Sequence, residues 1–303
     1  MSAPLVEVQD LAKTFDVSAP WLNRVIESKP RQFVHAVDGV AFAIERGRTL
    51  ALVGESGCGK STVARLLVGL YAPTRGRVLF DGQDTQGPLR PDAARALHRR
   101  MQMIFQDPYA SLNPRWKVLD IVGEPLREHG LVGDEALADR VGELLRSVGL
   151  SPADAVKFPH QFSGGQRQRI SIARALATQP EFLVCDEPTS ALDVSVQARV
   201  IALLMELGKK LDLTFLFISH DLSLMRNFAS EVGVLYLGKL VEAGPTQKLF
   251  EKPEHPYTRL LLASVPVISA EEEAIRPKLP LINGEVATAA QVLAGLAETQ
   301  SIS

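Results

Sequence analysis

The sequence predicts an α/β fold with a mainly parallel sheet, an antiparallel β edge and an inserted α-helical segment. Short apolar runs near the amino terminus predict strands. From Ser163 onward, helical and strand-like runs alternate, which is typical of a parallel sheet covered on both faces. Between these parts, residues 92–157 show helical periodicity and few strand-like runs, so we expect a helical insert there.

The amino-terminal part alternates apolar, aromatic and β-branched residues with turns. The strands expected there are Leu5–Val8, Val34–Val37, Val40–Ile44 and Thr49–Val53. Residues 18–32 contain Pro20, Trp21 and Pro30 and predict an inserted loop, whose Trp21–Leu22 pair could pack or dock.

The later elements follow from the same periodicities. A helix is expected from Ser61 to Leu70, and a loop from Gln106 to Pro114 interrupts the helical insert. Beyond it we expect a helix at 163–178, a strand at 182–185, a helix at 195–211 and a strand at 213–219. The predicted division is a core of residues 1–91 and 163–252, a helical subdomain of 92–162, and a carboxyl-terminal extension of 253–303.

Composition excludes several classes of protein. The 303 residues carry 33 Lys+Arg and 35 Asp+Glu, so a nucleic-acid binder that works through its whole surface is not expected. Arg95, Arg99 and Arg100 are interpreted as a solvated helix face. Cys58 and Cys185, the only cysteines, fit free thiols in a reducing cytoplasm. The first residues have neither a basic nor an apolar segment, so we expect neither export nor a membrane span within the chain.

A glycine-rich segment carries the strongest chemical signal. Residues Gly54 to Ser61 fit G-x-x-x-x-G-K-[ST], and they lie between a predicted strand and a predicted helix. Glycines allow backbone N–H groups to surround phosphate oxygens, and the helix amino terminus favours negative charge. Lys60 is expected to reach the β and γ phosphates, and Ser61 to hold Mg²⁺.

A second anion-binding helix end is predicted at Phe162 to Gln166. Ser163 is a favourable N-cap, and Gly164 and Gly165 expose backbone donors at the start of a helix. A capped helix after a flexible turn, without a ligand, explains the same residues.

Two carboxylates and a histidine complete the pattern. Asp186 and Glu187 end a buried strand beside the expected glycine-rich turn, where Asp186 would orient Mg²⁺ and Glu187 would polarise the attacking water. A turn or helix cap is the alternative for this acidic pair. His220 ends the next strand, and a purely structural histidine is its alternative.

Taken in order, these residues resemble the ATP-binding subunit of an ABC transporter over residues 5 to 265. The resemblance rests on the Walker A loop Gly54–Ser61, the Q-loop glutamine Gln106, the signature Phe162–Gln166, the Walker B Asp186 with the catalytic Glu187, the D-loop Ser190–Asp193 and the switch His220. It implies a RecA-like P-loop NTPase core, ATP and Mg²⁺ as cofactors, and a head-to-tail dimer with nucleotide between the Walker A loop of one subunit and the signature of the other.

The resemblance also implies residue roles. Glu187, His220 and Gln106 would be catalytic, and Ser61, Gln106 and Asp186 would serve the metal. The nucleotide would be bound by Phe15, Gly54, Glu55, Ser56, Gly57, Cys58, Gly59, Lys60, Ser61, Thr62, Ser163, Gly164, Gly165, Gln166 and Asp193. Phe15 is the candidate to stack on adenine, although the family more often has Tyr there; a core aromatic is the alternative.

The tail indicates a subfamily. Lys252 to Pro266, with His255-Pro256-Tyr257, resembles the segment that follows the core in oligopeptide and dipeptide importer ATPases, as do the segments near Trp21 and from Gln106 to Pro114. A turn before a helix is the simpler interpretation of His255-Pro-Tyr. Cysteine is absent after Cys185, which excludes a thiolate-held cluster in the tail. Residues 284–298, with Val286, Ala290, Leu293 and Leu296, predict either a docking helix or a frayed end.

The function implied is ATP-driven import of a small solute, di- or oligopeptides above all, by a peripheral subunit on the cytoplasmic side of the membrane. Its expected partners are two permease subunits, a sister ATPase or a second copy, and indirectly an extracytoplasmic solute-binding protein; nucleic acid is not expected. A soluble ABC ATPase of DNA repair or translation is the alternative. The chain lacks the sustained heptads and the second Walker A loop that such proteins need.

Overall fold

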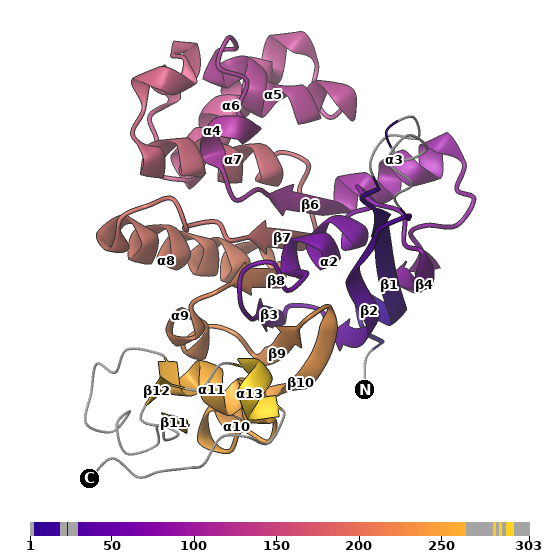
Figure 1. Cartoon of the computed structure of the whole chain (residues 1–303). Helices are drawn as coiled ribbons and strands as arrows, with labels where there is room; N and C mark the ends of the chain where they lie inside the picture. Colours follow the sequence, from indigo (N-terminus) through magenta and orange to yellow (C-terminus); the bar gives the residue numbers. More distant parts are fainter. Residues whose placement is uncertain are drawn as a thin grey trace.

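Six strands form the central sheet of the computed structural model, which describes residues 3–18, 23, 30–264, 281–282, 285–286 and 289–293 (Figure 1). The strand order is β10-β9-β3-β8-β7-β6, and every neighbouring pair is parallel except β9 and β10. The strands are β3 (Thr49–Val53), β6 (Met101–Ile104), β7 (Phe182–Asp186), β8 (Thr214–Ser219), β9 (Glu231–Tyr236) and β10 (Lys239–Pro245). The predicted mainly parallel sheet is confirmed.

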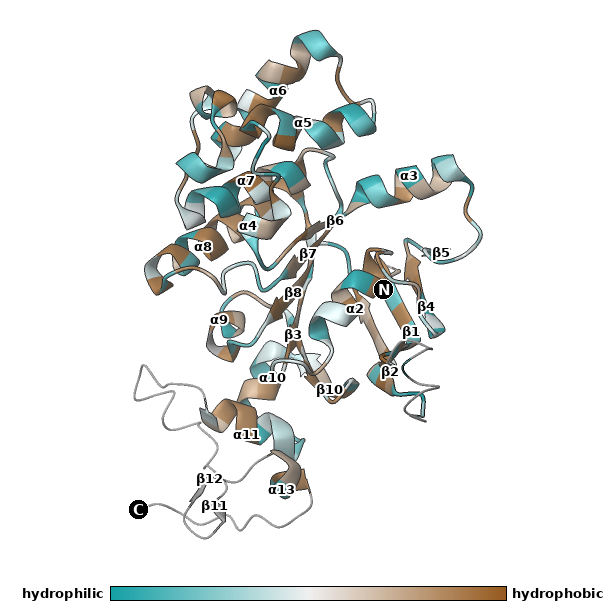
Figure 2. Ribbon diagram, turned by 45° about the horizontal axis from the view of Figure 1, so that its top comes forward, coloured by the Kyte–Doolittle hydropathy of each residue, from teal (hydrophilic) through white to brown (hydrophobic). Residues whose placement is uncertain are grey.

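Alternate residues of the central strands pack into two separate cores. On β8, Leu216 and Ile218 join the core under helix α2 (Lys60–Leu67), whereas Phe215 and Phe217 join the core under α8 (Val194–Leu211). Because successive side chains of a strand point to opposite faces, a strand covered on both sides must be apolar throughout. Figure 2 shows this as hydrophobic colour along β3, β7 and β8.

A second sheet of antiparallel strands, in the order β2-β1-β4-β5, lies beside the first (Figure 1). Its strands are β1 (Val6–Asp16), β2 (Phe33–Ile44), β4 (Arg75–Phe80) and β5 (Gln83–Asp84). The sequence predicted a shorter first strand and two strands within residues 34–44, and both predictions were wrong. Register shifts between Val8 and Thr14 let β1 pair with the whole of β2, because bulges absorb the extra residues without ending the ladder.

Helices lie above the parallel sheet in Figure 1. They are α3 (Pro91–Arg100), α4 (Pro108–Ser111), α5 (Val118–Glu128), α6 (Asp134–Ser147), the 3₁₀ turns η1 (Pro152–Val156) and η2 (Pro159–Gln161), and α7 (Gly164–Leu176). The expectation of an almost strand-free insert fails at Met101–Ile104, which pairs with β7. Four apolar residues are too few for periodicity to separate a strand from a helix.

The carboxyl-terminal part follows β8, and in Figure 1 its helices after the first lie below β9. Its elements are α9 (Leu222–Arg226), α10 (Thr246–Glu251), α11 (Pro256–Ser264), β11 (Leu281–Ile282), β12 (Glu285–Val286) and α13 (Ala289–Leu293). Within the predicted 284–298 stripe, Ala290 and Leu293 fall in α13, whereas Leu296 lies outside the described residues, as do Trp21 and Leu22. No helix in the described part of the chain is both long and apolar enough to span a membrane.

Four charged residues tie the two sheets together. Arg46, between β2 and β3, donates to Glu181 at 2.7 Å, and Arg100 at the end of α3 donates to Asp81 at 2.7 Å. Hydrogen bonds from Arg100 lower the pKa of both Asp81 and Glu181. Carboxyls with depressed pKa values add stability above their unfolded pKa of about 4, and this stability is lost as the pH falls through the folded values.

We therefore expect Glu181→Gln to lower the free energy of unfolding at pH 7 by about 1 kcal/mol or less, because the pairs are partly exposed. The difference from wild type should shrink as the pH falls below about 4, because the carboxyl of the unfolded chain takes up its proton first and the folded one follows at lower pH. Urea unfolding at pH 7 and pH 3.5 measures this. An equal difference at both pH values would show that the charge of Glu181 does not contribute.

Candidate functional site

Loops that follow the central strands meet at one edge of the sheet. Val53 pairs with Ser219, and Asp186 pairs with Ile218, so β3, β7 and β8 end side by side. Parallel strands place their carboxyl ends at the same edge, which is where ligands bind in open α/β sheets. The predicted phosphate loop, Glu187 and His220 therefore converge, although they are far apart in sequence.

The backbone of the phosphate loop lies close to the backbone of β2. Gly59 has φ 110°, and a Cβ there would lie 2.2 Å from the carbonyl oxygen of Ala36. Only glycine fits both constraints. Gly59 also precedes α2 without a side chain that could cap the helix, so the amino-terminal N–H groups of α2 face the loop.

Lys60 is held inside this loop. Its side chain is 4% exposed, and Nζ donates to the carbonyl oxygens of Gly54 at 2.7 Å and of Glu55 at 2.8 Å. Cys58 is a buried free thiol whose pKa is raised by burial, and Cys185 is also free and buried. The expectation of two free cysteines is confirmed.

The polar residues predicted for metal and water lie in hydrogen-bonding contact. Ser61 Oγ donates to Asp186 Oδ1 at 2.8 Å, and Gln106 Nε2 donates to Glu187 Oε2 at 2.9 Å. His220 Nδ1 lies 3.4 Å from the same Glu187 oxygen. Burial raises the pKa of the Asp186 carboxyl, against the effect of the bond from Ser61.

Glu187 adopts a backbone conformation that L-residues rarely use, with φ 45°. Its N–H donates to the carbonyl of Ile218 at 3.0 Å, which anchors this turn to the end of β8. Left-handed backbone at a non-glycine residue costs about 1–3 kcal/mol and is frequent at functional sites. In this conformation the Glu187 carboxylate lies within contact distance of Gln106 and His220.

A cavity of about 360 Å³ opens over the phosphate loop. The predicted residues that line it are Ser56, Gly57, Gly59, Lys60, Ser61, Thr62, Gln106 and Glu187. Sequence reasoning missed the other lining residues, Val34, His35, Ala36, Leu237 and Gly238. They come from β2 and from the β9–β10 turn, and only the pairing of distant strands brings them here.

The donor set suits Mg²⁺ bound together with a nucleotide. The described residues contain no group of three or more His, Cys, Asp or Glu side chains that could hold a metal ion. The protein ligands available are the Ser61 hydroxyl, the Asp186 carboxylate and the Gln106 amide oxygen. Mg²⁺ commonly takes one or two protein oxygens and completes its shell with phosphate and water, so these residues fit a nucleotide-bound ion.

Comparison with known proteins identifies the family. Residues 37–190 match the family described as "ABC transporter". The chain belongs to the ABC transporter family. Residues 241–295 match a second description, "Oligopeptide/dipeptide transporter, C-terminal region". Both matches confirm the resemblance drawn from the motifs, and the family makes the chain an ATP-binding ATPase.

Relatives and solved structures agree. The chain is 46% identical to the oligopeptide transport ATP-binding protein AppF of Bacillus subtilis over 282 residues, 93% of this chain and 84% of AppF. It is 47% identical to the glutathione import ATP-binding protein GsiA of Escherichia coli, covering 93% of this chain and 44% of GsiA. The structure of the ATP-binding cassette MJ0796 bound to ADP and Pi superimposes with a TM-score of 0.68 at 29% identity, over 80% of this chain and 98% of that one.

The residues predicted to form the family signature lie at a separate helix end. Ser163 caps α7 through a reciprocal capping box, in which its Oγ accepts from Gln166 N–H at 3.4 Å and its N–H donates to Gln166 Oε1 at 3.0 Å. Asp193 caps α8 and accepts from Val196 N–H at 3.0 Å. These residues are outside the lining of the Walker A cavity in the described chain. One subunit therefore does not bring its two predicted anion sites together.

Gly165 is needed for the packing of α7 against α8. A Cβ on Gly165 would lie 2.4 Å from Val196 Cγ1. Gly165→Ala should destabilise the protein by about 1–3 kcal/mol, since overpacking forces neighbours to shift. Val196→Ala removes the obstructing methyl, so the double variant should be more stable than the sum of the two single effects. Additive free energies of unfolding in urea would contradict this contact.

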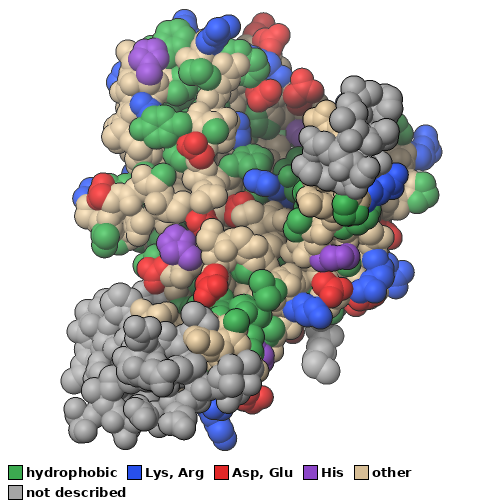
Figure 3. All heavy atoms as spheres, in the orientation of Figure 1, with side chains coloured by type: hydrophobic (Ala, Val, Ile, Leu, Met, Phe, Trp, Pro, Cys, Tyr) green, Lys and Arg blue, Asp and Glu red, His purple; other side chains and the backbone are tan. Residues whose placement is uncertain are grey.

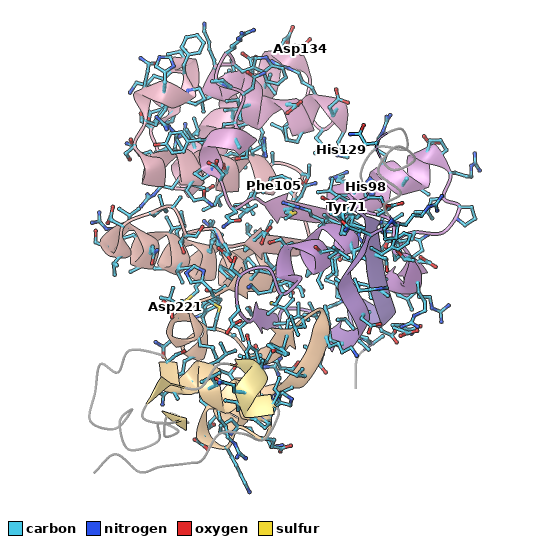
Figure 4. All side chains as sticks on the ribbon, in the orientation of Figure 1. Tyr71, His98, Phe105, His129, Asp134 and Asp221 are labelled. Carbon is cyan, nitrogen blue, oxygen red and sulfur yellow. The ribbon has the colours of Figure 1, made fainter. Side chains whose placement is uncertain are left out.

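Phe15 lies near the end of β1, where the sequence places the candidate for stacking on adenine. Its ring contacts Tyr71 edge to face, with centroids 5.5 Å apart, and Lys13 Nζ lies 5.2 Å from the Phe15 centroid. Tyr71, labelled in Figure 4, lies near β1 and follows α2. Phe15 is outside the cavity lining among the described residues, whereas Val34, its partner across the β1–β2 ladder, is part of it. The adenine contact of Phe15 stays a prediction.

Proposed function

We propose that this chain is the ATP-hydrolysing subunit of an importer for small solutes, namely di- or oligopeptides. The observation that carries this proposal is the match of residues 241–295 to the carboxyl-terminal region of oligopeptide and dipeptide transporters. It is supported by relatives named for oligopeptide transport and glutathione import. Residues 253–303 would then be the importer-type extension. Residues 92–162, apart from strand β6 of the central sheet, would be the helical subdomain, and the remainder the ATP-binding core.

The proposed chemistry uses the residues that meet at the strand ends. Lys60 would leave its two carbonyl acceptors to neutralise the β and γ phosphates, while Ser61 and Asp186 would hold Mg²⁺. Bound Mg²⁺ would supply charge neutralisation between the phosphates. Glu187 would orient the attacking water, with Gln106 and His220 fixing its carboxylate from two sides.

A second ATPase subunit would complete this site. The signature end of α7 lies apart from the Walker A cavity of the same chain, which supports a head-to-tail arrangement with a sister ATPase or a second copy. Two permease subunits would carry the solute, with an extracytoplasmic binding protein acting indirectly, and the subunit would be peripheral on the cytoplasmic side. Nucleic acid is not a proposed partner; on the face drawn in Figure 3, Lys and Arg side chains alternate with Asp and Glu.

A soluble ABC ATPase of DNA repair or translation is the alternative, and the match over residues 241–295 does not favour it. The two functions are separated by purification of a tagged Glu187→Gln variant from its native cells. Membranes would be solubilised with ATP and Mg²⁺, and co-purifying proteins identified by mass spectrometry. Two multi-span permeases, absent from an untagged control, are expected. Ribosomal or repair proteins without permeases would overturn the importer.

A further inference from the structure

The carboxyl-terminal segment places one aromatic residue directly beneath the phosphate loop. Tyr257 lies in the first turn of α11, just after the His255-Pro256 pair, and is fully buried. Its ring contacts the ring of Tyr236, with centroids 4.3 Å apart. Tyr236 ends β9, next to Leu237 and Gly238, which line the cavity. Tyr257 is therefore packed behind the wall of the nucleotide site.

The hydroxyl of Tyr257 is hydrogen-bonded to the phosphate loop itself. Glu55 N–H donates to Tyr257 Oη at 3.1 Å. The same peptide unit carries the Gly54 carbonyl, which accepts from Lys60 Nζ at 2.7 Å. One peptide thus connects Tyr257 to the lysine expected to bind phosphate, and hydrogen bonds at the two ends of a peptide polarise and strengthen one another.

The segment that carries Tyr257 is itself fixed to the core. The Glu242 carboxylate on β10 accepts from the N–H groups of Glu254 at 2.8 Å and His255 at 2.9 Å. His255 Nδ1 accepts from Tyr257 N–H at 3.2 Å. These contacts determine where α11 begins, and hence where the Tyr257 hydroxyl lies.

The phosphate loop has a further outside support on this side. Gly238 N–H donates to the carbonyl of Cys58 at 2.9 Å. Together with the Tyr257 bond, it fixes the backbone at both ends of the Gly54–Cys58 stretch. Neither bond uses the N–H groups of the α2 amino terminus, so both can persist while an anion is bound there.

We propose that Tyr257 is a positioning residue of the ATP site, whose hydroxyl holds the Gly54–Glu55 peptide and thereby the phosphate loop in its binding conformation. The inference rests on ATP binding by this chain and not on the identity of the solute. It makes the carboxyl-terminal extension a structural part of the nucleotide site. The ring of Tyr257 packs against Tyr236, and its hydroxyl holds the phosphate loop.

Tyr257→Phe, in the full chain, tests the hydroxyl alone. Loss of the hydrogen bond between Glu55 N–H and the Tyr257 hydroxyl should raise the Kd and KM for MgATP about three- to tenfold. The kcat should stay within about twofold of wild type, because this bond lies away from Glu187. Thr258→Val is the matched control. Thr258 is fully buried on the same helix, and its hydroxyl has no hydrogen-bond partner among the described residues, so this variant should match wild type.

Alkylation of the two cysteines provides a readout that does not depend on nucleotide. Cys58 lies in the phosphate loop and Cys185 in β7, and both are buried. In Tyr257→Phe, a looser loop should speed the reaction of Cys58 with N-ethylmaleimide several-fold, measured by peptide mass spectrometry, and leave Cys185 unchanged. General destabilisation would speed both thiols together.

Three results would overturn the proposal: an unchanged ATP affinity and Cys58 rate in Tyr257→Phe, equal acceleration of both cysteines, or the same change in Thr258→Val. A wild-type chain that does not bind MgATP would instead count against the proposed function. In that case the Cys58 rate alone still decides whether Tyr257 holds the loop.

Discussion

Glu187→Gln should leave ATP binding within about twofold of wild type and slow hydrolysis by about 10²- to 10⁴-fold, the usual contribution of a positioned acid or base. Gln has the shape of Glu and still accepts a hydrogen bond from Gln106, so the strained turn at φ 45° is retained. It cannot, however, accept a proton from the attacking water. ATP affinity by calorimetry and phosphate release under saturating MgATP measure the two effects separately.

The matched control for this variant is Glu143→Gln. Glu143 lies on α6 and is paired only with Arg140 at the surface among the contacts that the structure describes. This substitution removes the same charge at a position outside the site, so the rate of hydrolysis should be unchanged. Wild-type turnover by Glu187→Gln would remove Glu187 from catalysis and direct attention to His220, which faces the same space.

Lys60→Ala should give the opposite pattern, with ATP binding weakened by about 10- to 100-fold, as expected for the loss of hydrogen bonds to a charged group. In the structure the ammonium satisfies two loop carbonyls, those of Gly54 and Glu55. The variant therefore loses a phosphate partner and also leaves these carbonyls without their donor. Direct measurement of the Kd for MgATP tests the prediction.

Lys210→Ala controls for the loss of a lysine charge, because Lys210 is exposed at the end of α8. Its affinity for ATP should equal that of wild type. If Lys60→Ala bound ATP as tightly as this control, the cavity over α2 would not be the phosphate site. The contrast between Lys60→Ala, which loses binding, and Glu187→Gln, which loses turnover, separates the two roles.

Local sequence was sufficient for the parts of the site that lie within one strand-loop-helix unit. The pattern of residues Gly54 to Ser61 predicted a phosphate loop between a strand and a helix, and in the structure these residues connect β3 to α2. The Asp186-Glu187 pair was likewise readable, because a buried strand followed by two carboxylates has a limited set of explanations. In both cases the chemistry depends on neighbours along the chain.

Other residues could not be placed in this way. The sequence analysis did not predict a strand at Met101–Ile104. This strand brings Gln106 to the carboxyl edge of the sheet, where Gln106 Nε2 lies 2.9 Å from Glu187 Oε2. Phe15 was assigned to adenine from its position in the family pattern; its ring contacts Tyr71 in the structure, and the adenine contact stays a prediction. Short apolar runs and edge aromatics have no local signal that fixes their partners.

The sequence by itself determined the family, the phosphate loop and the identity of the acidic and histidine residues, because motif chemistry is encoded in spacing along the chain. Only the tertiary structure decided that Val34, Leu237 and Gly238 line the nucleotide cavity and that the Tyr257 hydroxyl supports the Glu55 peptide from 202 positions away. Contacts of this kind depend on strand order and on the angle at which α11 docks. Those are set by the packing of the whole core, which no local pattern contains.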